Sequence, residues 1–313
     1  MVIDSLKFLF YLLIFPGFLF VTVFGLIVDW VDRKVTARVQ FRQGPPLLQN
    51  FYDVFKLLGK EVILIKDSPY FLFIIAPIIA FATVLMSSTL VGAAFFWEMG
   101  IGGDLLFIVY LMAIYSVAMI IGASSTGNIY SSIGASREMK MVLSDDLAFI
   151  LVLLVPIIQS GYKINFHQII GFQETNGMII GSASGIIAFI IGIICIQAKM
   201  GLRPFDIAEA ETEIVEGTLM EYSGPLLALW KLCHFMMYVF LPMLLVILFW
   251  GGFHFTSFGS IIGGIGKYLL IVVVMILIRN TNPRVRIDSA LKFFWRYASP
   301  LAFIAVILAI LGV

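Results

Sequence analysis

The chain is built from a series of long apolar runs, and these runs constrain its fold more than any other feature. The run LLALWKLCHFMMYVFLPMLLVILF, residues 226–249, is longer than the roughly 18 apolar residues that a membrane-spanning helix needs. Hydrophobic residues make up 61% of the 313 residues and charged residues only 12%, about half the charged fraction of a soluble domain. The sequence therefore predicts an all-α polytopic membrane protein.

We predict eight transmembrane helices and treat residues 1–313 as a single membrane domain. The first apolar run is too long for a signal peptide and ends in DWVDRK rather than in small residues, so we interpret it as a retained span. The predicted spans cover approximately residues 6–28, 70–95, 105–127, 141–159, 178–199, 224–249, 261–279 and 297–313.

The distribution of basic residues predicts the orientation in the membrane. Most of the 20 Lys and Arg residues lie in or beside four connections, 29–69, 128–140, 200–223 and 279–296. Eight spans place all four connections on one side and both termini on the other. Because basic loops stay on the cytoplasmic side, we expect both termini outside and the charged loops facing the cytoplasm from the cell membrane. The two halves show no inverted repeat, which counts against an independent secondary transporter.

The first basic connection contains an amphipathic segment. In LLQNFYDVFKLLGKEVILI, residues 47–65, apolar side chains recur at the three- and four-residue spacing of one helical face, whereas most charged residues lie off that face. The segment is too polar to span, so we predict a helix over about 47–65 that lies flat at the interface. The alternative is an ordinary helical loop packed under the bundle.

No residue pattern indicates a redox centre, a nucleotide site or a metal site. Membrane haems usually need paired histidines, and His234 has no partner at similar depth in the sequence. Cys195 and Cys233 stand alone within apolar runs and are expected to pack in the core. We therefore expect no catalytic residue, no cofactor and no metal in this chain, and no nucleic-acid partner.

Between the fifth and sixth predicted spans the sequence reads RPFDIAEAETEIVEGTLMEYS, residues 203–223. If this segment is helical, spacing places Asp206, Glu209, Glu213 and Glu216 on one face and Glu211 on another, with Glu221 beyond. Carboxylates about 6 Å apart repel by roughly 3 kcal/mol at an effective dielectric of about 20. We therefore expect some of these carboxyls to keep a proton near neutral pH, as a proton path needs.

The alternative interpretation of this acidic segment is a solvated loop whose carboxylates pair with bases of neighbouring loops, such as Arg279 and Arg284. Two further groups of residues are candidates for the same path. Glu138, Asp145 and Asp146 lie at the mouth of the fourth span, where Asp145 and Asp146 could instead cap a helix beside Ser144. Lys231, His234 and Tyr238 follow helical spacing in the sixth span, where packed core residues are the alternative.

Four motifs, one in each basic connection, resemble a known family. They are DRKVTARVQFRQGP (32–45), GNIYSSIGASRE (127–138), RPFDIAEAETEIVEGTLMEYSG (203–224) and RNTNPRVRID (279–288). They are similar, in order, to motifs of the NuoH-like membrane subunit of NADH:quinone oxidoreductases. In two places, PPLLQNFYDVFKLLGKE (45–61) and VEGTLMEYSG (215–224), the chain looks more like the membrane subunit of energy-converting nickel–iron hydrogenase and sulfane reductase complexes.

This resemblance implies a subunit that anchors a hydrophilic electron-transfer arm and couples ferredoxin-driven hydrogen evolution or sulfane reduction to proton or sodium translocation. The implied partners are hydrogenase-like large and small subunits, which carry iron–sulfur clusters and a nickel–iron or related centre, together with antiporter-like and small membrane subunits. The alternatives are the quinone-site subunit of an NADH-type or coenzyme-F420-type quinone or phenazine oxidoreductase, and a purely structural anchor.

By matching position, the resemblance implies that Arg33, Arg38, Arg42 and Arg203 belong to the junction with the arm. It likewise implies that the acidic passage contains Asp206, Glu209, Glu211, Glu213, Glu221 and Asp146. Residues chosen by charge and spacing complete two groups of candidates. The proton path comprises Asp206, Glu209, Glu211, Glu213, Glu216, Glu221, Asp145, Asp146, Glu138, Lys231, His234 and Tyr238. The interface with the arm comprises Arg33, Lys34, Arg38, Arg42, Arg203, Arg279, Arg284 and Arg286.

Overall fold

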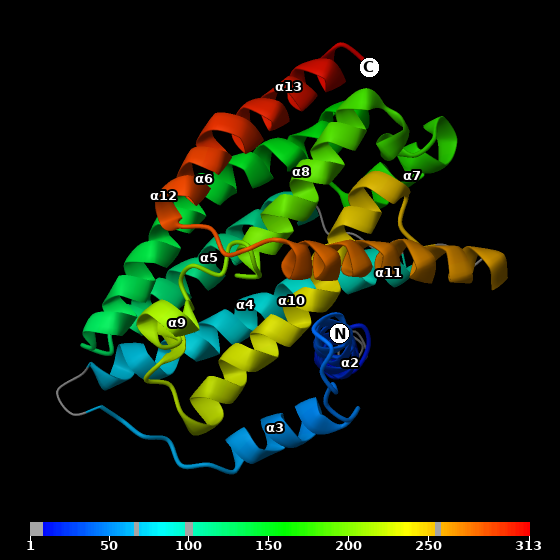
Figure 1. The fold of residues 1–313 in the computed structure, drawn as a ribbon. Coiled ribbons are helices and arrows are strands. Elements are labelled where there is room, and N and C mark those ends of the chain that lie inside the picture. Colours follow the sequence, from blue (N-terminus) through cyan, green and yellow to red (C-terminus); the bar gives the residue numbers. More distant parts are fainter. Residues whose placement is uncertain (1–8, 66–68, 98–102, 254–257) are drawn as a thin grey trace.

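The computed structural model of the protein describes residues 9–65, 69–97, 103–253 and 258–313. Within these ranges every regular element is a helix (Figure 1), which confirms the predicted all-α fold class. Seven helices are long and apolar enough to cross a membrane, and a shorter apolar helix of 17 residues takes the place of the predicted span 178–199. The start of the first predicted span, residues 6–8, lies outside the described residues.

Most helices that correspond to predicted spans differ from them only in their ends. The first predicted span, 6–28, is not continuous, because the helix that includes residues 9–13 is interrupted at residues 14–17 before α2 begins. In chain order, the helices for the first seven spans are α2 (Phe18–Val39), α4 (Tyr70–Trp97), α5 (Asp104–Ser124), α6 (Ile129–Gln159), α8 (Ala183–Lys199), α10 (Gly224–Trp250) and α11 (Phe258–Thr281). The last span corresponds to three elements that follow one another without a break: α12 (Ile287–Phe293), η3 (Phe294–Ala298) and α13 (Ser299–Ile310). The shorter elements are α3 (Gln49–Leu58), α7 (Phe166–Asn176), η1 (Ile179–Gly181), α9 (Glu211–Ile214) and η2 (Gly217–Leu219).

Helix α10 forms the centre of the bundle. It packs against α4, α2, α3, α11, α8 and α7, and nearly all its residues from Cys233 to Phe249 are buried. Figure 1 shows it in yellow, crossing α4 and lying beside α2 and α11. A helix that is apolar on every side is expected to be surrounded by other helices, and α10 is apolar around its whole circumference beyond Tyr238.

Helix α6 begins about three turns before the predicted span and includes the predicted connection 128–140. Asn128 caps the helix, because its side-chain oxygen accepts a hydrogen bond of 2.9 Å from the backbone N–H of Tyr130. The helix therefore carries Arg137 and Glu138 rigidly towards the acidic segment. Helix α2 likewise continues past the predicted span to Val39 and includes Asp32 and Arg33.

The amphipathic helix α3 is shorter than the predicted helix over 47–65, and it ends at Leu58 before Gly59. Residues 61–65 are not helical. The backbone N–H of Ile63 donates instead to Ser223 Oγ at 3.0 Å, and Gly224 approaches the carbonyl oxygens of Lys60 and Glu61. Tertiary contact with the start of α10 thus replaces the last turns of the predicted helix.

Candidate functional site: a charged cavity at the end of the bundle

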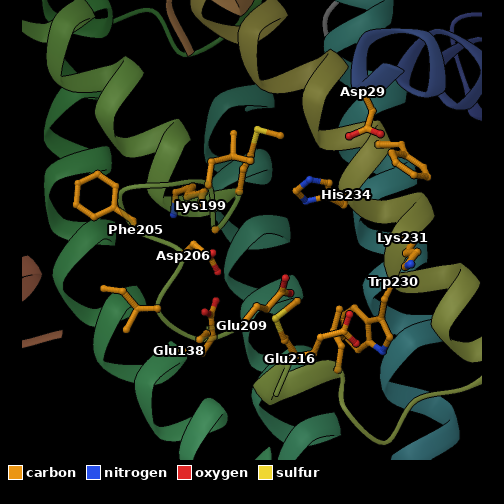
Figure 2. Close-up of a pocket in the computed structure, with 18 of the residues that line it drawn as sticks. Asp29, Glu138, Lys199, Phe205, Asp206, Glu209, Glu216, Trp230, Lys231 and His234 are labelled. Carbon is orange, nitrogen blue, oxygen red and sulfur yellow. The ribbon is translucent and has the colours of Figure 1, made fainter. Parts of the chain in front are cut away.

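A cavity of about 320 Å³ lies where residues 199–216 face α10, α6 and α2 (Figure 2). Its ionisable lining residues come from six different parts of the chain. Asp29 and Arg33 belong to α2, Glu138 to α6, Lys199 to α8, Asp206, Glu209 and Glu216 to the acidic segment, Lys231 and His234 to α10, and Arg279 to α11. The aromatic residues Tyr115, Phe205, Trp230 and Phe235 complete much of the wall.

The acidic segment is not the continuous helix that its spacing predicts. Glu211–Ile214 form a single turn of α-helix, α9, and the next three residues, Val215, Glu216 and Gly217, have φ angles of 49°, 63° and 46°. This left-handed region terminates an α-helix. The chain then folds back so that a Cβ on Gly217 would lie 2.0 Å from the carbonyl oxygen of Ala208, a contact that only glycine permits. The prediction of a four-carboxylate helical face is therefore wrong.

The folded-back loop sorts the carboxylates into different environments. Asp206, Glu209 and Glu216 line the cavity, whereas Glu213 is exposed and does not line it. Glu221 lies beyond the loop and accepts a hydrogen bond from the side chain of Asn128. Glu211 begins α9, and its side chain lies outside the described part of the structure.

Two of the acids form ion pairs with bases of other loops, as the alternative interpretation expected. Asp206 Oδ2 lies 2.6 Å from an amino nitrogen of Arg284, and Glu213 Oε2 lies 2.7 Å from one of Arg137. Glu209 has no ion-pair or hydrogen-bond partner among the described residues. The cavity therefore contains one carboxyl group of this loop, Glu209, that is only partly exposed and has no direct counter-ion.

The environment of Glu209 raises the pKa of its carboxyl group to about 8. Burial is the largest cause, because it disfavours the charged form. The neighbouring carboxylates Asp206, Glu138 and Glu216 raise the pKa further, and Lys231 opposes them. Near neutral pH this geometry favours a protonated Glu209.

A second charged cluster adjoins the cavity, where α6 and α8 pack together. Lys199 Nζ lies 3.1 Å from a carboxylate oxygen of Asp145 and 2.5 Å from one of Asp146. The alternative that these acids cap a helix is wrong, because α6 starts about four turns earlier and its cap is Asn128. Lys199 also reaches the cavity, together with Glu138. Because Lys199 both lines the cavity and pairs with Asp145, the cluster extends from the cavity into the contact between α6 and α8.

The three polar residues of α10 have two different environments. Lys231 and His234 line the cavity and face the acidic loop across it (Figure 2). Tyr238 is fully buried one turn further on, where its hydroxyl donates a 2.9 Å hydrogen bond to Asp32. Asp32 also forms an ion pair with Arg279. Tyr238 therefore belongs to a network between α2, α10 and α11 rather than to the cavity wall.

The residues expected at an interface with the arm also separate into two groups. The first group consists of four exposed arginines: Arg38, Arg42, Arg203 and Arg286. Among them, Arg42 donates a hydrogen bond to the side chain of Gln40, two residues before it. Lys34 lies 3.5 Å from the carbonyl oxygen of Gly44. Arg33 and Arg279 instead line the cavity, and Arg284 holds Asp206.

Sequence reasoning missed three polar residues that shape the site: Asp29, Asn50 and Lys199. Asp29 is buried beside the cavity and accepts a 2.9 Å hydrogen bond from the Asn50 side chain, which also binds Arg33. The DWVDRK sequence placed two acids at the end of an apolar run, and a charge at that position is the signal that could have identified Asp29. The described residues contain no cluster of His, Cys, Asp and Glu suited to a metal ion.

Comparison with known proteins places these features in a family. A family model described as NADH dehydrogenase matches residues 11–310. The NuoH-type membrane subunit of NADH-quinone oxidoreductase from Anoxybacillus flavithermus is 32% identical over 307 residues, covering 94% of this chain and 89% of the relative. The corresponding protein from Dehalococcoides mccartyi is 30% identical over 304 residues, covering 93% and 83%.

A solved structure, the membrane-bound sulfane sulfur reductase, described as an archaeal respiratory membrane complex, contains a chain that superposes with a TM-score of 0.84 at 27% identity. The match covers 96% of this chain and 99% of that one. Together with the four motifs and the helical bundle, these matches identify this chain as a member of the NADH dehydrogenase family, a NuoH-like membrane subunit of the complex I-like oxidoreductases.

Proposed function

We propose that this chain is a coupling subunit of a multisubunit respiratory complex and that it transmits redox events in a hydrophilic arm to ion translocation in the membrane. In this proposal the charged connections face the cytoplasm, both termini lie outside, and the arm docks on exposed bases such as Arg38, Arg42 and Arg203. The relatives, a quinone oxidoreductase subunit and a chain of a sulfane sulfur reductase, support membership in such a complex. Iron–sulfur clusters and a nickel–iron or related centre belong to the partner subunits.

One observation carries the proposal: Glu209 lies without a counter-ion in a cavity that it shares with Asp206, Glu138, Glu216 and His234, as judged from the described residues. Its pKa of about 8 lies close to physiological pH. A unit charge that appears about 10 Å away changes such a pKa by roughly one unit at an effective dielectric of about 20. Reduction or protonation of a centre docked above the cavity therefore changes how many protons this group holds.

The positions of the charged groups define the path that we propose for the proton. Glu138 lines the cavity together with Glu209 and Lys199, and Lys199 forms ion pairs with Asp145 and Asp146 where α6 and α8 pack together. The groups come from the acidic loop, α6 and α8, so the row is assembled by folding rather than by sequence spacing. We propose that protons pass from Glu209 through Glu138 to this cluster, and from there to antiporter-like partner subunits.

The test is the isosteric Glu209→Gln variant in the assembled complex, with ions translocated per electron as the measurement. We expect electron transfer to continue and the ion ratio to fall at least severalfold, because an amide cannot exchange a proton. Glu213→Gln is the matched control, because Glu213 is exposed outside the cavity and its ion pair with Arg137 is solvated. An unchanged ion ratio in Glu209→Gln contradicts the proposal.

A purely structural anchor is the first alternative, and the ion pairs count against it. Asp206 and Glu213 already pair with Arg284 and Arg137 of the same chain, so they are poor partners for bases of the arm. The anchor predicts that Glu209→Gln releases the arm and stops electron transfer as well. Retention of the arm, measured by copurification, separates the two functions.

A quinone site is the second candidate, and it is supported by the aromatic wall of Tyr115, Phe205, Trp230 and Phe235 around the 320 Å³ cavity. This volume falls at the lower end of the range for small-molecule sites. If a quinone binds here, Trp230→Ala is expected to slow the reduction of a soluble quinone analogue and to leave retention of the arm unchanged. A complex that reduces no quinone analogue contradicts this candidate.

A further inference from the structure

A second hollow, of about 660 Å³, lies on the flank of the bundle beside the connection that follows α11, and nothing in the proposed function uses it. We call it the flank groove. It is bounded by the last turns of α8 and α11, the segment Pro204–Phe205, and the helix formed by α12 and η3. Its apolar wall includes Phe205, Ile278 and Phe293, and its polar lining residues include Gln197, Ser289, Lys292 and Arg296.

The flank groove combines an apolar wall with an uncompensated positive rim. Lys292 and Arg296 are one helical turn apart on the α12–η3 helix, both are exposed, and none of the described residues that line the groove is acidic. Neither base has a hydrogen-bond or ion-pair partner in the part of the chain that the structure describes. Arg296 moreover lies within Ile287–Ile310, a helix apolar and long enough to span. A cation at such a position is expected to have an anionic partner.

An unsatisfied acceptor lines the same groove. Gln197 is fully buried, and its Nε2 donates to the carbonyl oxygens of Arg203 and Met275 at 2.9 Å and 3.2 Å. Its Oε1 has no donor among the described atoms, although a buried acceptor is normally paired. The hydroxyl group of Ser289 has no hydrogen bond among the described residues either. The groove therefore offers two cations and a free hydroxyl around an apolar floor.

We propose that the flank groove binds one anionic phospholipid of the surrounding bilayer. The phosphate lies between Lys292 and Arg296, the lipid accepts or donates a hydrogen bond at the Ser289 hydroxyl, and an acyl chain covers Ile278 and Phe293. Basic pockets between transmembrane helices bind anionic headgroups in this way. The inference depends only on the chain spanning a membrane, and it is independent of the proposed coupling function.

Phe205 lines both the flank groove and the charged cavity, so this residue separates the proposed lipid from the cavity. Gln197 also holds the carbonyl oxygen of Arg203, three residues before Asp206. A lipid in the flank groove therefore packs against the outer side of the segment whose inner side carries Asp206. Loss of the lipid is expected to loosen residues 203–206 without removing any cavity residue.

The experiment uses the protein purified with its bound subunits and placed in phosphatidylcholine nanodiscs containing phosphatidylglycerol. Native mass spectrometry counts the phosphatidylglycerol molecules that remain bound after the disc is removed. We expect Lys292→Gln/Arg296→Gln to retain one molecule fewer, with an affinity about 25-fold lower, because each base near a headgroup contributes roughly a fivefold gain. Lys56→Gln/Lys140→Gln removes two exposed bases outside the groove and is expected to leave the retention of phosphatidylglycerol unchanged.

A second variant separates a seated lipid from a headgroup held at the surface. Ser289→Trp fills the groove from an exposed position and keeps both cations, so it is expected to displace the lipid as well. Equal retention in the wild type and Lys292→Gln/Arg296→Gln overturns the proposal, as does full retention in Ser289→Trp. A photo-crosslinking residue at position 289 provides a third test. A crosslink to phosphatidylglycerol supports the proposed lipid site, and a crosslink to a partner polypeptide overturns the proposal.

Discussion

Arg284 and Asp206 form an ion pair of 2.6 Å between the connection that follows α11 and the first carboxylate of the acidic loop. Both side chains are mostly buried, at 19% and 18% exposed. The backbone N–H of Val285 donates to the carbonyl oxygen of Pro204 at 3.0 Å beside them. Two connections from distant parts of the chain are thus held together above the cavity.

Arg284→Gln is expected to lower the free energy of unfolding by about 1–3 kcal/mol, because it leaves a partly buried carboxylate without its charged partner. Thermal unfolding of the solubilised complex measures the change. Combining it with Asp206→Asn is expected to cost less than the sum of the two single changes, since both remove the same interaction. Arg286→Gln, two residues away and exposed, is the control, and an equal effect of both arginine changes contradicts this role.

Lys199→Gln is expected to be the most destabilising single charge removal in the site. It leaves Asp145 and Asp146 facing each other without a cation between two apolar helices, and breaking a buried ion pair from one side costs about 3–5 kcal/mol. Adding Asp145→Asn is expected to restore part of the lost stability. Yield of folded protein from membranes measures both, with the exposed Lys140→Gln on α6 as the control. A milder effect than that of Lys140→Gln contradicts a buried cluster.

Glu209 is expected to make stability depend on pH. Its pKa is raised from about 4.5 to about 8 in the folded chain, so between these values the folded state holds a proton that the unfolded state has lost. The stabilisation from this proton is complete below about pH 4.5, declines through the interval and is absent above about pH 8, with a slope of at most about 1.4 kcal/mol per pH unit.

The measurement compares the unfolding temperature of the wild type and of Glu209→Gln from pH 5 to pH 8.5. The glutamine variant lacks the titrating group, so its stability relative to the wild type is expected to rise as the pH rises. Infrared spectra give an independent reading, because the absorption of protonated carboxyl groups at neutral pH should decrease in the variant, leaving the contribution of Glu138, whose pKa burial raises to about 7. Parallel pH profiles contradict the raised pKa, and Glu213→Gln is expected to reproduce the wild-type slope.

Local sequence patterns were sufficient for the fold but not for the site. The apolar runs predicted each long helix, because a spanning helix satisfies its backbone hydrogen bonds within one continuous segment. Helical spacing of the acids wrongly suggested a continuous helix, because the left-handed residues Val215 and Glu216 are stabilised by contact between Gly217 and Ala208. Lys199 was missed for a similar reason, since only the packing of α8 on α6 brings it to Asp145.

The close approach of α6 to the acidic loop gives the last prediction. A Cβ on Gly134 would lie 2.8 Å from the backbone nitrogen of Thr218 and 3.0 Å from the carbonyl oxygen of Ala208. Both neighbours are backbone atoms, which cannot turn aside as a flexible side chain can. Gly134→Ala is therefore expected to push the loop away from α6 while leaving the helices in place.

Displacement of the loop exposes Glu209 to water, so the pKa of its carboxyl is expected to fall from about 8 towards the ordinary value. The protonated carboxyl band at neutral pH measures this fall, and circular dichroism checks that the helices persist. Gly171→Ala in α7 is the matched control, because a Cβ there meets no atom within 4 Å. An undiminished band in Gly134→Ala means that α6 does not hold the loop, and that the elevated pKa depends on the loop's own fold alone.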